Sequence, residues 1–303
     1  MGRRPGPCRN VLIVSDQPTR HWVELGAHRV SYLAAGSVDD PVVLLLHGLA
    51  SDATTWLPAI EALSAHRLRV LAVDLLGHGG SDKPELPYSL TLFGDMVGDF
   101  LDALGLGAVT MAGHSLGGAV AMQLGYHQPE RVARLVLVSS GGLGKQVHPM
   151  LRVASLPGAG QLLGLAVNRR TGTVLRSPRL HGRLRLSPEQ VVNLSRAGRN
   201  LMTREGRAAF ITTLRSVIEP AGQRGSMLEM NYLAAHVPTL IVWSERDHVI
   251  PVRHAYDTHE RLPGSRLTLL PGSSHEPHRR YAGQFAEAVA AFVASTEPAQ
   301  HGP

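Results

Sequence analysis

The apolar positions in the first half of the chain follow two alternating patterns. A short continuous apolar run lies at residues 42–46, and similar, mostly apolar runs follow at residues 69–73, 108–112 and 134–138. Such runs are typical of strands buried on both faces of a parallel sheet. Between them, apolar side chains recur at helical spacing over residues 55–64, 91–104 and 116–127. This alternation predicts βαβ units, and therefore an α/β fold with a mostly parallel, doubly wound sheet flanked by helices.

The pattern changes at both ends and in the middle of the chain. Residues 21–25 and 29–33 flank Gly26, Ala27 and His28, which predicts an antiparallel hairpin at the edge of the sheet. The strand pattern stops near Gly141 and returns at residues 239–243 and 265–270. A last amphipathic helix is predicted at residues 284–293, and the tail after Ser295 is predicted to be disordered.

This interruption predicts two parts: an α/β core formed by residues 1–144 and 236–303, and a helical cap, or lid, inserted at residues 145–235. Residues 145–224 carry 14 Lys and Arg against 3 acidic residues, whereas the rest of the chain carries 16 against 21. Two interpretations of the basic segment stay open. It forms a solvated helical surface, or it is a cap that attracts acidic substrates or membrane lipid.

Composition limits the class of protein. With 44% apolar and 18% charged residues among 303, the chain suits a globular protein with a sizeable core. No apolar run approaches the about 18 residues of a membrane span, so we expect no stable membrane insertion. The apolar run at residues 11–14 is too short for a signal peptide. A cytoplasmic location is the simplest expectation, and export in folded form stays open.

The same composition argues against several kinds of site. Cys8 is the only cysteine, which excludes an intrachain disulfide and a thiolate metal cluster. Basic and aromatic residues are not interleaved, so nucleic-acid binding is not expected.

One short segment carries candidate chemistry. The pattern Gly-x-Ser-x-Gly occurs once, between a predicted strand and a predicted helix, in Gly113-His114-Ser115-Leu116-Gly117-Gly118. A serine at such a sharp turn projects its hydroxyl out of the sheet, and side chains at 113 and 117 would collide with neighbouring backbone. The start of the helix adds positive potential where an oxyanion forms. This context points to Ser115 as a nucleophile.

Together with Leu46-His47-Gly48 and residues 74–84, this segment resembles the α/β-hydrolase fold superfamily, in particular capped bacterial serine esterase/lipase-like members. The resemblance extends over nearly the whole chain. It implies a catalytic triad in which Ser115 is followed by an acid and then by a histidine. The loop at residues 243–251 makes Asp247 the acid, and the loop at 271–275 makes His275 the general base. The family's other acid position, at residues 139–142, offers no carboxylate.

Other residues take expected roles around this triad. By the same resemblance, the oxyanion hole uses the backbone N–H groups of Leu49 and Leu116. His47 and His78 are expected to stabilise turns, and His114 to pack beneath the nucleophile. The family usually has an aromatic or apolar residue after the base. Here Glu276 stands there, with a predicted effect on the pKa of His275 or on binding of a polar substrate group.

These assignments predict a serine hydrolase that cleaves carboxylic esters through an acyl-enzyme on Ser115. The expected substrate is a small-molecule ester with an apolar acyl group, and no metal or organic cofactor is implied. Two alternatives stay open: hydrolysis of a C–C bond in a diketone-like substrate by the same triad, and a ligand-binding, receptor-like protein without turnover. The sequence leaves the physiological substrate, the acyl length and the oligomeric state undetermined.

Overall fold

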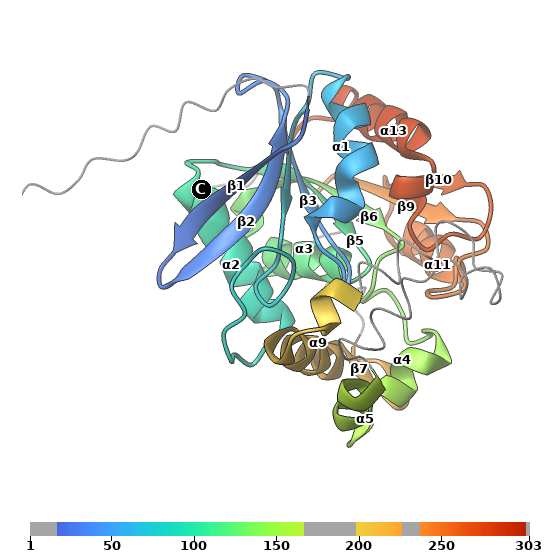
Figure 1. The fold of residues 1–303 in the computed structure, drawn as a ribbon. Coiled ribbons are helices and arrows are strands. Elements are labelled where there is room, and N and C mark those ends of the chain that lie inside the picture. Colours follow the sequence, from blue (N-terminus) through green and yellow to red (C-terminus); the bar gives the residue numbers. More distant parts are fainter. Residues whose placement is uncertain (1–16, 167–197, 226–236, 301–303) are drawn as a thin grey trace, which may run out of the picture.

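A single eight-stranded sheet organises the molecule. The computed structural model describes residues 17–166, 198–225 and 237–300, and Figure 1 shows the sheet at its centre. The strands are arranged in the order β1-β2-β4-β3-β5-β6-β9-β10. Their bounds are β1 (Thr19–Leu25), β2 (His28–Ala35), β3 (Val42–Leu46), β4 (Arg69–Val73), β5 (Val109–His114), β6 (Val132–Val138), β9 (Thr239–Ser244) and β10 (Arg266–Leu270).

The direction of pairing agrees with the predicted topology. The β1–β2 and β2–β4 pairs are antiparallel, and all other neighbours in the sheet are parallel. The predicted hairpin is present, with β1 at the edge of the sheet. The prediction of a mostly parallel α/β fold is confirmed.

Helices cover both faces of the sheet because successive strand residues point to opposite sides. In β3, Leu44 and Leu46 belong to the core cluster that includes side chains of α2 (Leu90–Ala103), α3 (Leu116–His127) and α11 (Arg253–Arg261). Val43 and Leu45 belong to the opposite cluster, with α1 (Leu57–Ser64) and α13 (Ala282–Ala294). The continuous apolar runs are therefore the consequence of burial on two faces.

Outside the segment between β6 and β9, three features differ from the sequence-based expectation. Helix α11 was not predicted, because among its nine residues only His254, Ala255 and Thr258 are buried and no apolar stripe marks it. A short helix, α12 (Pro277–Arg280), precedes α13. The prediction of a disordered tail is wrong for residues 296–300, since the Ala299 N–H donates to the Ala133 carbonyl at 2.9 Å.

The segment between β6 and β9, residues 145–235, is here named the insertion segment. Its described parts, residues 145–166 and 198–225, are mainly helical, as expected. An unpredicted hairpin, β7–β8, follows the longest of these helices, and each of its strands has two residues. The elements are α4 (Pro149–Ala154), α5 (Ala159–Ala166), α9 (Arg204–Val217), β7 (Ile218–Glu219) and β8 (Gly222–Gln223). The predicted helical content of residues 167–197 and 226–235 lies outside the described residues.

Figure 1 shows α4, α5 and α9 grouped at one end of the molecule, away from α13. A small apolar core holds them together, centred on Phe210 and Leu214 of α9 and including Leu151 of α4. In the part of the chain that the structure describes, no helix combines the length and apolar character needed to cross a membrane.

Candidate active site

Ser115 occupies a strained turn between β5 and α3. Its φ of 53° and ψ of −115° lie where L-residues are rarely found, at a cost of about 1–3 kcal/mol. A Cβ on Gly113 would lie 2.3 Å from the Gly117 carbonyl oxygen, and one on Gly117 would lie 2.2 Å from the Leu46 carbonyl oxygen. Position 113 therefore requires glycine because the turn folds back on itself, and position 117 requires it because the turn packs against the end of β3.

The backbone of Ser115 is held from the neighbouring strand. Its N–H donates to the Val138 carbonyl at 3.0 Å, and its carbonyl accepts from Gly118 at 3.1 Å and Gly141 at 2.9 Å. These bonds tie the turn to the carboxyl end of β6. A strained conformation persists only where surrounding contacts enforce it, and these contacts do so.

Asp247 and His275 meet beside this turn. Asp247 follows β9 and His275 follows β10, and these two strands are parallel neighbours, so both loops leave the same edge of the sheet. The Nδ1 atom of His275 lies 2.7 Å from Oδ2 of Asp247. The Asp247 side chain is fully buried, whereas that of His275 is 18% exposed. Thus the carboxylate is shielded from solvent, whereas the imidazole ring remains partly accessible.

The environment of Asp247 keeps it ionised. Burial by itself raises its pKa, but the charge and hydrogen bond of His275 and the amides of Val249 and Ile250 hold the pKa below its usual value. Those amides donate to Oδ1 at 2.8 and 3.1 Å. Because ionised Asp247 accepts at Oδ2, Nδ1 of His275 carries a proton, and Nε2 is the acceptor in the neutral ring.

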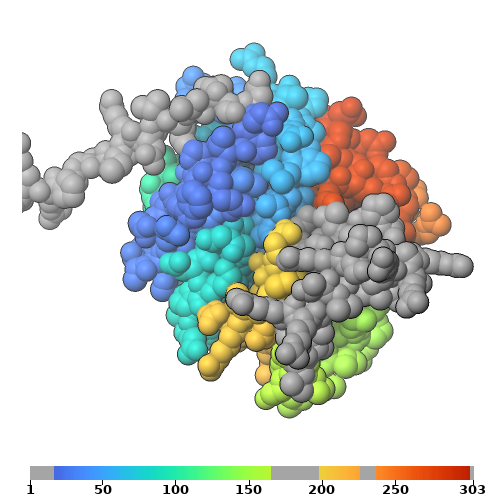
Figure 2. All heavy atoms as spheres, in the orientation of Figure 1, coloured from blue at the N-terminus to red at the C-terminus, as the bar shows by residue number. Residues whose placement is uncertain are grey.

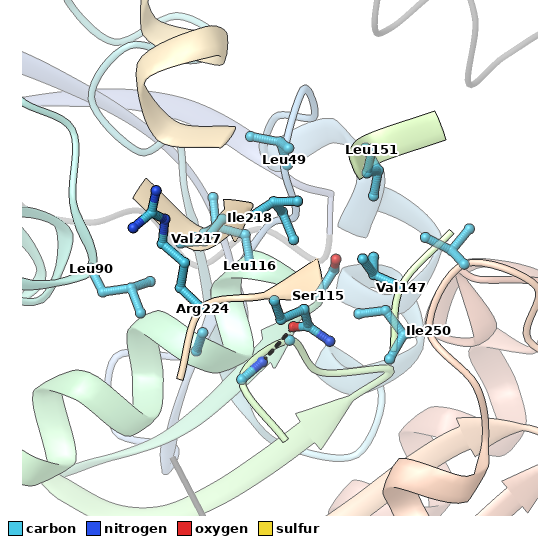
Figure 3. A pocket seen from close by; sticks show the side chains of 15 residues that line it. Leu49, Leu90, Ser115, Leu116, Val147, Leu151, Val217, Ile218, Arg224 and Ile250 are labelled. Atoms are coloured by element: carbon cyan, nitrogen blue, oxygen red, sulfur yellow. Dashed lines mark hydrogen bonds between the residues drawn. The ribbon is translucent and has the colours of Figure 1, made fainter. Parts of the chain in front are cut away.

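Ser115 and His275 line one cavity of about 390 Å³, here named the larger cavity, which is also lined by Leu49, Leu151 and Glu276. A second cavity of about 60 Å³, the smaller cavity, also reaches Ser115. Its lining is mostly apolar, and Figure 3 shows aliphatic side chains around Ser115. They include Leu49, Leu90, Leu116, Val147, Val217, Ile218 and Ile250.

His114 supports the loop that carries His275. Its Nε2 lies 2.8 Å from the backbone carbonyl oxygen of His275. Burial, and secondarily the neighbouring His275, lower the pKa of His114 to about 4. The ring is therefore neutral at pH 7, and its Nε2–H donates to the carbonyl. His114 lies next to the nucleophile, as predicted, but its hydrogen bond is to the backbone of His275.

Glu276 is buried within a polar group behind the site. Its Oε1 accepts from the hydroxyl of Thr55 at 3.1 Å, and its Oε2 lies 3.4 Å from Nη1 of Arg279. The residue also lines the larger cavity. Its carboxylate is therefore held by Thr55 and Arg279 in the wall of the cavity that His275 also lines.

His47 and His78 form hydrogen bonds with the backbone of the loops that follow β3 and β4. The Nε2 atom of His47 accepts from the Leu75 N–H at 3.0 Å, so its Nδ1–H donates to the Gly48 carbonyl at 2.8 Å. Burial, and then His47, lower the pKa of His78 to about 3. Neither histidine lines a cavity that contains Ser115.

Leu49 and Leu116, the residues predicted to form the oxyanion hole, line the smaller cavity together with Ser115. Leu116 is the first residue of α3, where N–H groups have no partner within the helix. Leu49 lines both cavities and precedes Ala50, a non-glycine residue at a φ of 57°. The loop after β3 is therefore another point of backbone strain next to Ser115.

Asn200, from the insertion segment, fastens that loop and was not singled out in the sequence. Its Nδ2 donates to the carbonyls of Ala50 at 3.2 Å and Ser51 at 3.0 Å, and its Oδ1 accepts from Gly79 N–H at 3.1 Å. The side chain is buried. The sequence around Asn200 does not indicate this role, because its hydrogen-bond partners lie more than 100 residues away in the chain.

Among the residues that the structure describes, no group of three or more His, Cys, Asp or Glu side chains is arranged to hold a metal ion.

Comparisons with known proteins agree with this architecture. A family model described as alpha/beta hydrolase fold matches residues 41–278. The chain therefore belongs to the α/β hydrolase fold family. It is similar to an uncharacterized protein of Mycobacterium tuberculosis (strain ATCC 25618 / H37Rv), at 38% identity over 97% of this chain and 87% of that protein.

Two further relatives carry functional names. A 2-hydroxy-6-oxo-6-(2'-aminophenyl)hexa-2,4-dienoic acid hydrolase of Metapseudomonas resinovorans is 27% identical over 90% of each chain. The crystal structure of a bacterial membrane phospholipase A superimposes with a TM-score of 0.71 at 25% identity, over 92% of this chain and 86% of that one. Family and relatives together support hydrolase activity.

Proposed function

We propose that this protein is a serine hydrolase that cleaves carboxylic esters through an acyl-enzyme on Ser115. One observation carries the proposal. The strained Ser115 and the ring of His275 line the same cavity, and that ring is held by buried Asp247 at 2.7 Å. A serine hydroxyl is a weak nucleophile until a base removes its proton, and an acceptor Nε2 is suited to that task.

In the proposed reaction, Oγ of Ser115 attacks the ester carbonyl carbon while its proton passes to Nε2 of His275. Asp247 stabilises the resulting imidazolium, and the N–H groups of Leu49 and Leu116 bind the oxyanion. The intermediate collapses as His275 returns the proton to the departing alkoxide. A water molecule, deprotonated by the same ring, then releases the carboxylic acid and restores Ser115.

The lining of the smaller cavity supports an apolar acyl group as the substrate portion next to Ser115. Leucine, isoleucine and valine side chains dominate its wall (Figure 3). Burial of apolar surface contributes about 25 cal/mol per Å², so longer acyl chains gain binding until the cavity is filled.

We also propose that the insertion segment acts as a helical cap. Leu151 of α4, Val217 of α9 and Ile218 of β7 line the smaller cavity together with Ser115, although they belong to residues 145–235. The segment thus contributes part of the substrate's surroundings. The segment begins after the carboxyl end of β6, at the edge of the sheet where open α/β folds bind ligands, and the chain then returns to the amino end of the parallel strand β9.

A second candidate function is hydrolysis of a C–C bond in an acidic, diketone-like substrate. Among the described residues that line the smaller cavity, Arg224 is the only charged one. A guanidinium there would bind a substrate carboxylate. The relative from Metapseudomonas resinovorans, named as hydrolase of a dienoic acid, supports keeping this candidate.

The deciding experiment measures turnover of p-nitrophenyl esters of increasing chain length, with rapid mixing to detect a burst of p-nitrophenol. Ester hydrolysis predicts a burst of about one equivalent per chain and none in Ser115→Ala. Turnover of a diketone-like acid without ester turnover would favour the second candidate. Covalent labelling of Ser115 without any turnover would favour a receptor-like protein.

A further inference from the structure

The surface of α4, α5 and the turn between them exposes four large apolar side chains. Met150 is 71% exposed, Val153 62%, Leu156 41% and Leu162 68%. Among the described residues, the other exposed large hydrophobic side chains are isolated in the sequence: Trp22, Val38, Tyr126 and Tyr256. Scattered apolar residues are ordinary on a protein surface, whereas a group of four within one helical pair indicates an interaction site.

The backbone beneath this group is well anchored. Nε of Arg152 donates to the Pro220 carbonyl at 2.7 Å. The guanidinium of Arg215 donates to the carbonyls of Ser155 at 3.1 Å and Leu156 at 2.8 Å. Helix α4 also turns Leu151 inward, where it lines both cavities. Met150 and Val153 are thus exposed on a helix that is packed on its other side.

The surrounding charge is mostly positive. The sequence has no Asp or Glu between Glu130 and Glu189. The described parts of the insertion segment carry seven basic residues and two acidic ones, Glu205 and Glu219. Lys145 and Arg152 are exposed on the same stretch as the apolar group. Figure 1 and Figure 2 show α4 and α5, in yellow-green, at one end of the molecule.

We propose that the surface formed by Met150, Val153, Leu156 and Leu162 docks on an anionic lipid surface. Apolar side chains enter the headgroup–acyl boundary, while nearby Lys and Arg pair with lipid phosphates. A second copy of the chain is a poorer occupant. A two-fold contact would place each copy's basic surface against the same surface of its partner, and like charges repel.

Docking in this orientation has a consequence for the cavities. Leu151 lies on the inner side of the helix whose outer side carries Met150 and Val153. A lipid surface bound at α4 therefore lies next to the wall of both cavities. Lipid docking concerns where the protein acts, and it does not depend on the reaction proposed above.

The test is vesicle flotation with Ser115→Ala protein, so that no lipid is consumed. We expect binding to vesicles of phosphatidylcholine mixed with phosphatidylglycerol, with weaker binding at high salt and to phosphatidylcholine alone. Adding Met150→Ser and Leu162→Ser should weaken binding about tenfold or more. Adding Lys145→Glu instead should reduce binding to the anionic vesicles by a similar factor.

The matched control adds Tyr126→Ser and Tyr256→Ser, which remove exposed aromatic rings elsewhere on the surface, and it should bind like the Ser115→Ala parent. Circular dichroism and the melting temperature establish that each variant is folded. Equal binding of parent and Met150→Ser/Leu162→Ser protein would overturn the proposal, as would failure of the parent to bind anionic vesicles. A dimer that dissociates in the same double variant, without vesicle binding, would assign the surface to a second copy. Absence of ester turnover by the protein that retains Ser115, with vesicle binding of the Ser115→Ala parent intact, would count against the proposed reaction alone.

Discussion

The Nδ1 atom of His275 lies 2.7 Å from Oδ2 of Asp247, and the other oxygen of that carboxylate is held by two backbone amides. The amides leave the carboxylate one orientation, so the ring is fixed with Nδ1 protonated and Nε2 accepting. This relationship gives the proposed mechanism its direction of proton flow. It also leads to the sharpest mutational test.

Asp247→Asn should lower kcat by about 10⁴-fold, the size of the effect of the same change in a serine protease triad. The amide can donate to Nδ1 and so favours the wrong tautomer of His275. Steady-state kinetics on a p-nitrophenyl ester measures the loss. Glu245→Gln, two residues away on the same loop, is the matched control. Near-normal activity of Asp247→Asn with a large loss in Glu245→Gln would mean that the wrong carboxylate has been chosen.

Ser115→Ala should abolish covalent labelling by a fluorophosphonate probe, because the hydroxyl is the atom that forms the bond. The unmodified protein should take up one label per chain, as counted by mass spectrometry of the intact protein. Undiminished labelling of the variant would assign the nucleophile to another residue.

Gly117→Ala should destabilise the elbow and remove labelling of Ser115. The new Cβ would lie 2.2 Å from the Leu46 carbonyl oxygen, so backbone must move. Overpacking of this kind costs about 1–3 kcal/mol. Gly107→Ala is the matched control, since a Cβ there meets nothing within 4 Å. Thermal denaturation and probe labelling of the two variants should differ clearly, and equal behaviour would contradict the packing argument.

Asn200→Ala should lower kcat about tenfold or more with little change in KM. The substitution releases the carbonyls of Ala50 and Ser51, and a small displacement of the Leu49 N–H weakens contact with the oxyanion. The rate is divided by the concentration of active sites, which is titrated with the fluorophosphonate probe. A loss of folded protein therefore does not change the measured kcat.

The control for Asn200 is Thr203→Ala, which removes the side-chain cap of α9 in the same segment. Loss of such a cap costs about 1 kcal/mol of stability and should leave kcat per titrated site unchanged. If both variants lose only stability, Asn200 is structural and does not position the loop.

Stability should fall on mild acidification because His114 is buried and neutral. Its pKa is about 4 in the folded protein and about 6.5 in an unfolded chain. Between these values the unfolded state binds the extra proton, so stability is fully present above the higher pKa and is lost as pH falls toward the lower one. From pH 7 to pH 5 the loss attributable to His114 is about 2 kcal/mol.

His114→Gln keeps a donor for the His275 carbonyl and cannot be protonated. Chemical denaturation at pH 7 and pH 5 should therefore give a smaller pH-dependent loss in this variant. His78, with a pKa of about 3, contributes a similar loss of stability in both proteins. The difference between the losses of the two proteins is therefore the contribution of His114. An equally steep loss in the variant would contradict a neutral His114 in the folded state.

Local chemistry explains which parts of the fold could be predicted from the sequence. A strand buried on both faces needs an apolar residue at every position, so β3 and β4 are visible as continuous runs. The elbow is visible because its glycines are required by backbone packing within a few residues of Ser115. The positions of Asp247 and His275 came from resemblance to a family, since 27 residues separate them in the chain.

Features that depend on distant contacts could not be found in this way. Helix α11 has few apolar residues because only a small part of its surface is buried. The residues after Ser295 contain no regular pattern, yet Ala299 pairs with the backbone next to β6. In both cases the stabilising partner lies far away along the chain, and local periodicity carries no information about it.

The sequence by itself determined the alternation of strands and helices, the serine turn and the basic character of the insertion segment. Each depends on composition or on neighbours a few residues apart. Tertiary structure decided that Asn200 fastens the loop next to Leu49, that His114 donates to the backbone of His275, and that the apolar side chains of α4 and α5 face outward. The physical reason is that hydrogen-bond partners and solvent exposure are properties of positions in space, which the order of residues sets only through the completed fold.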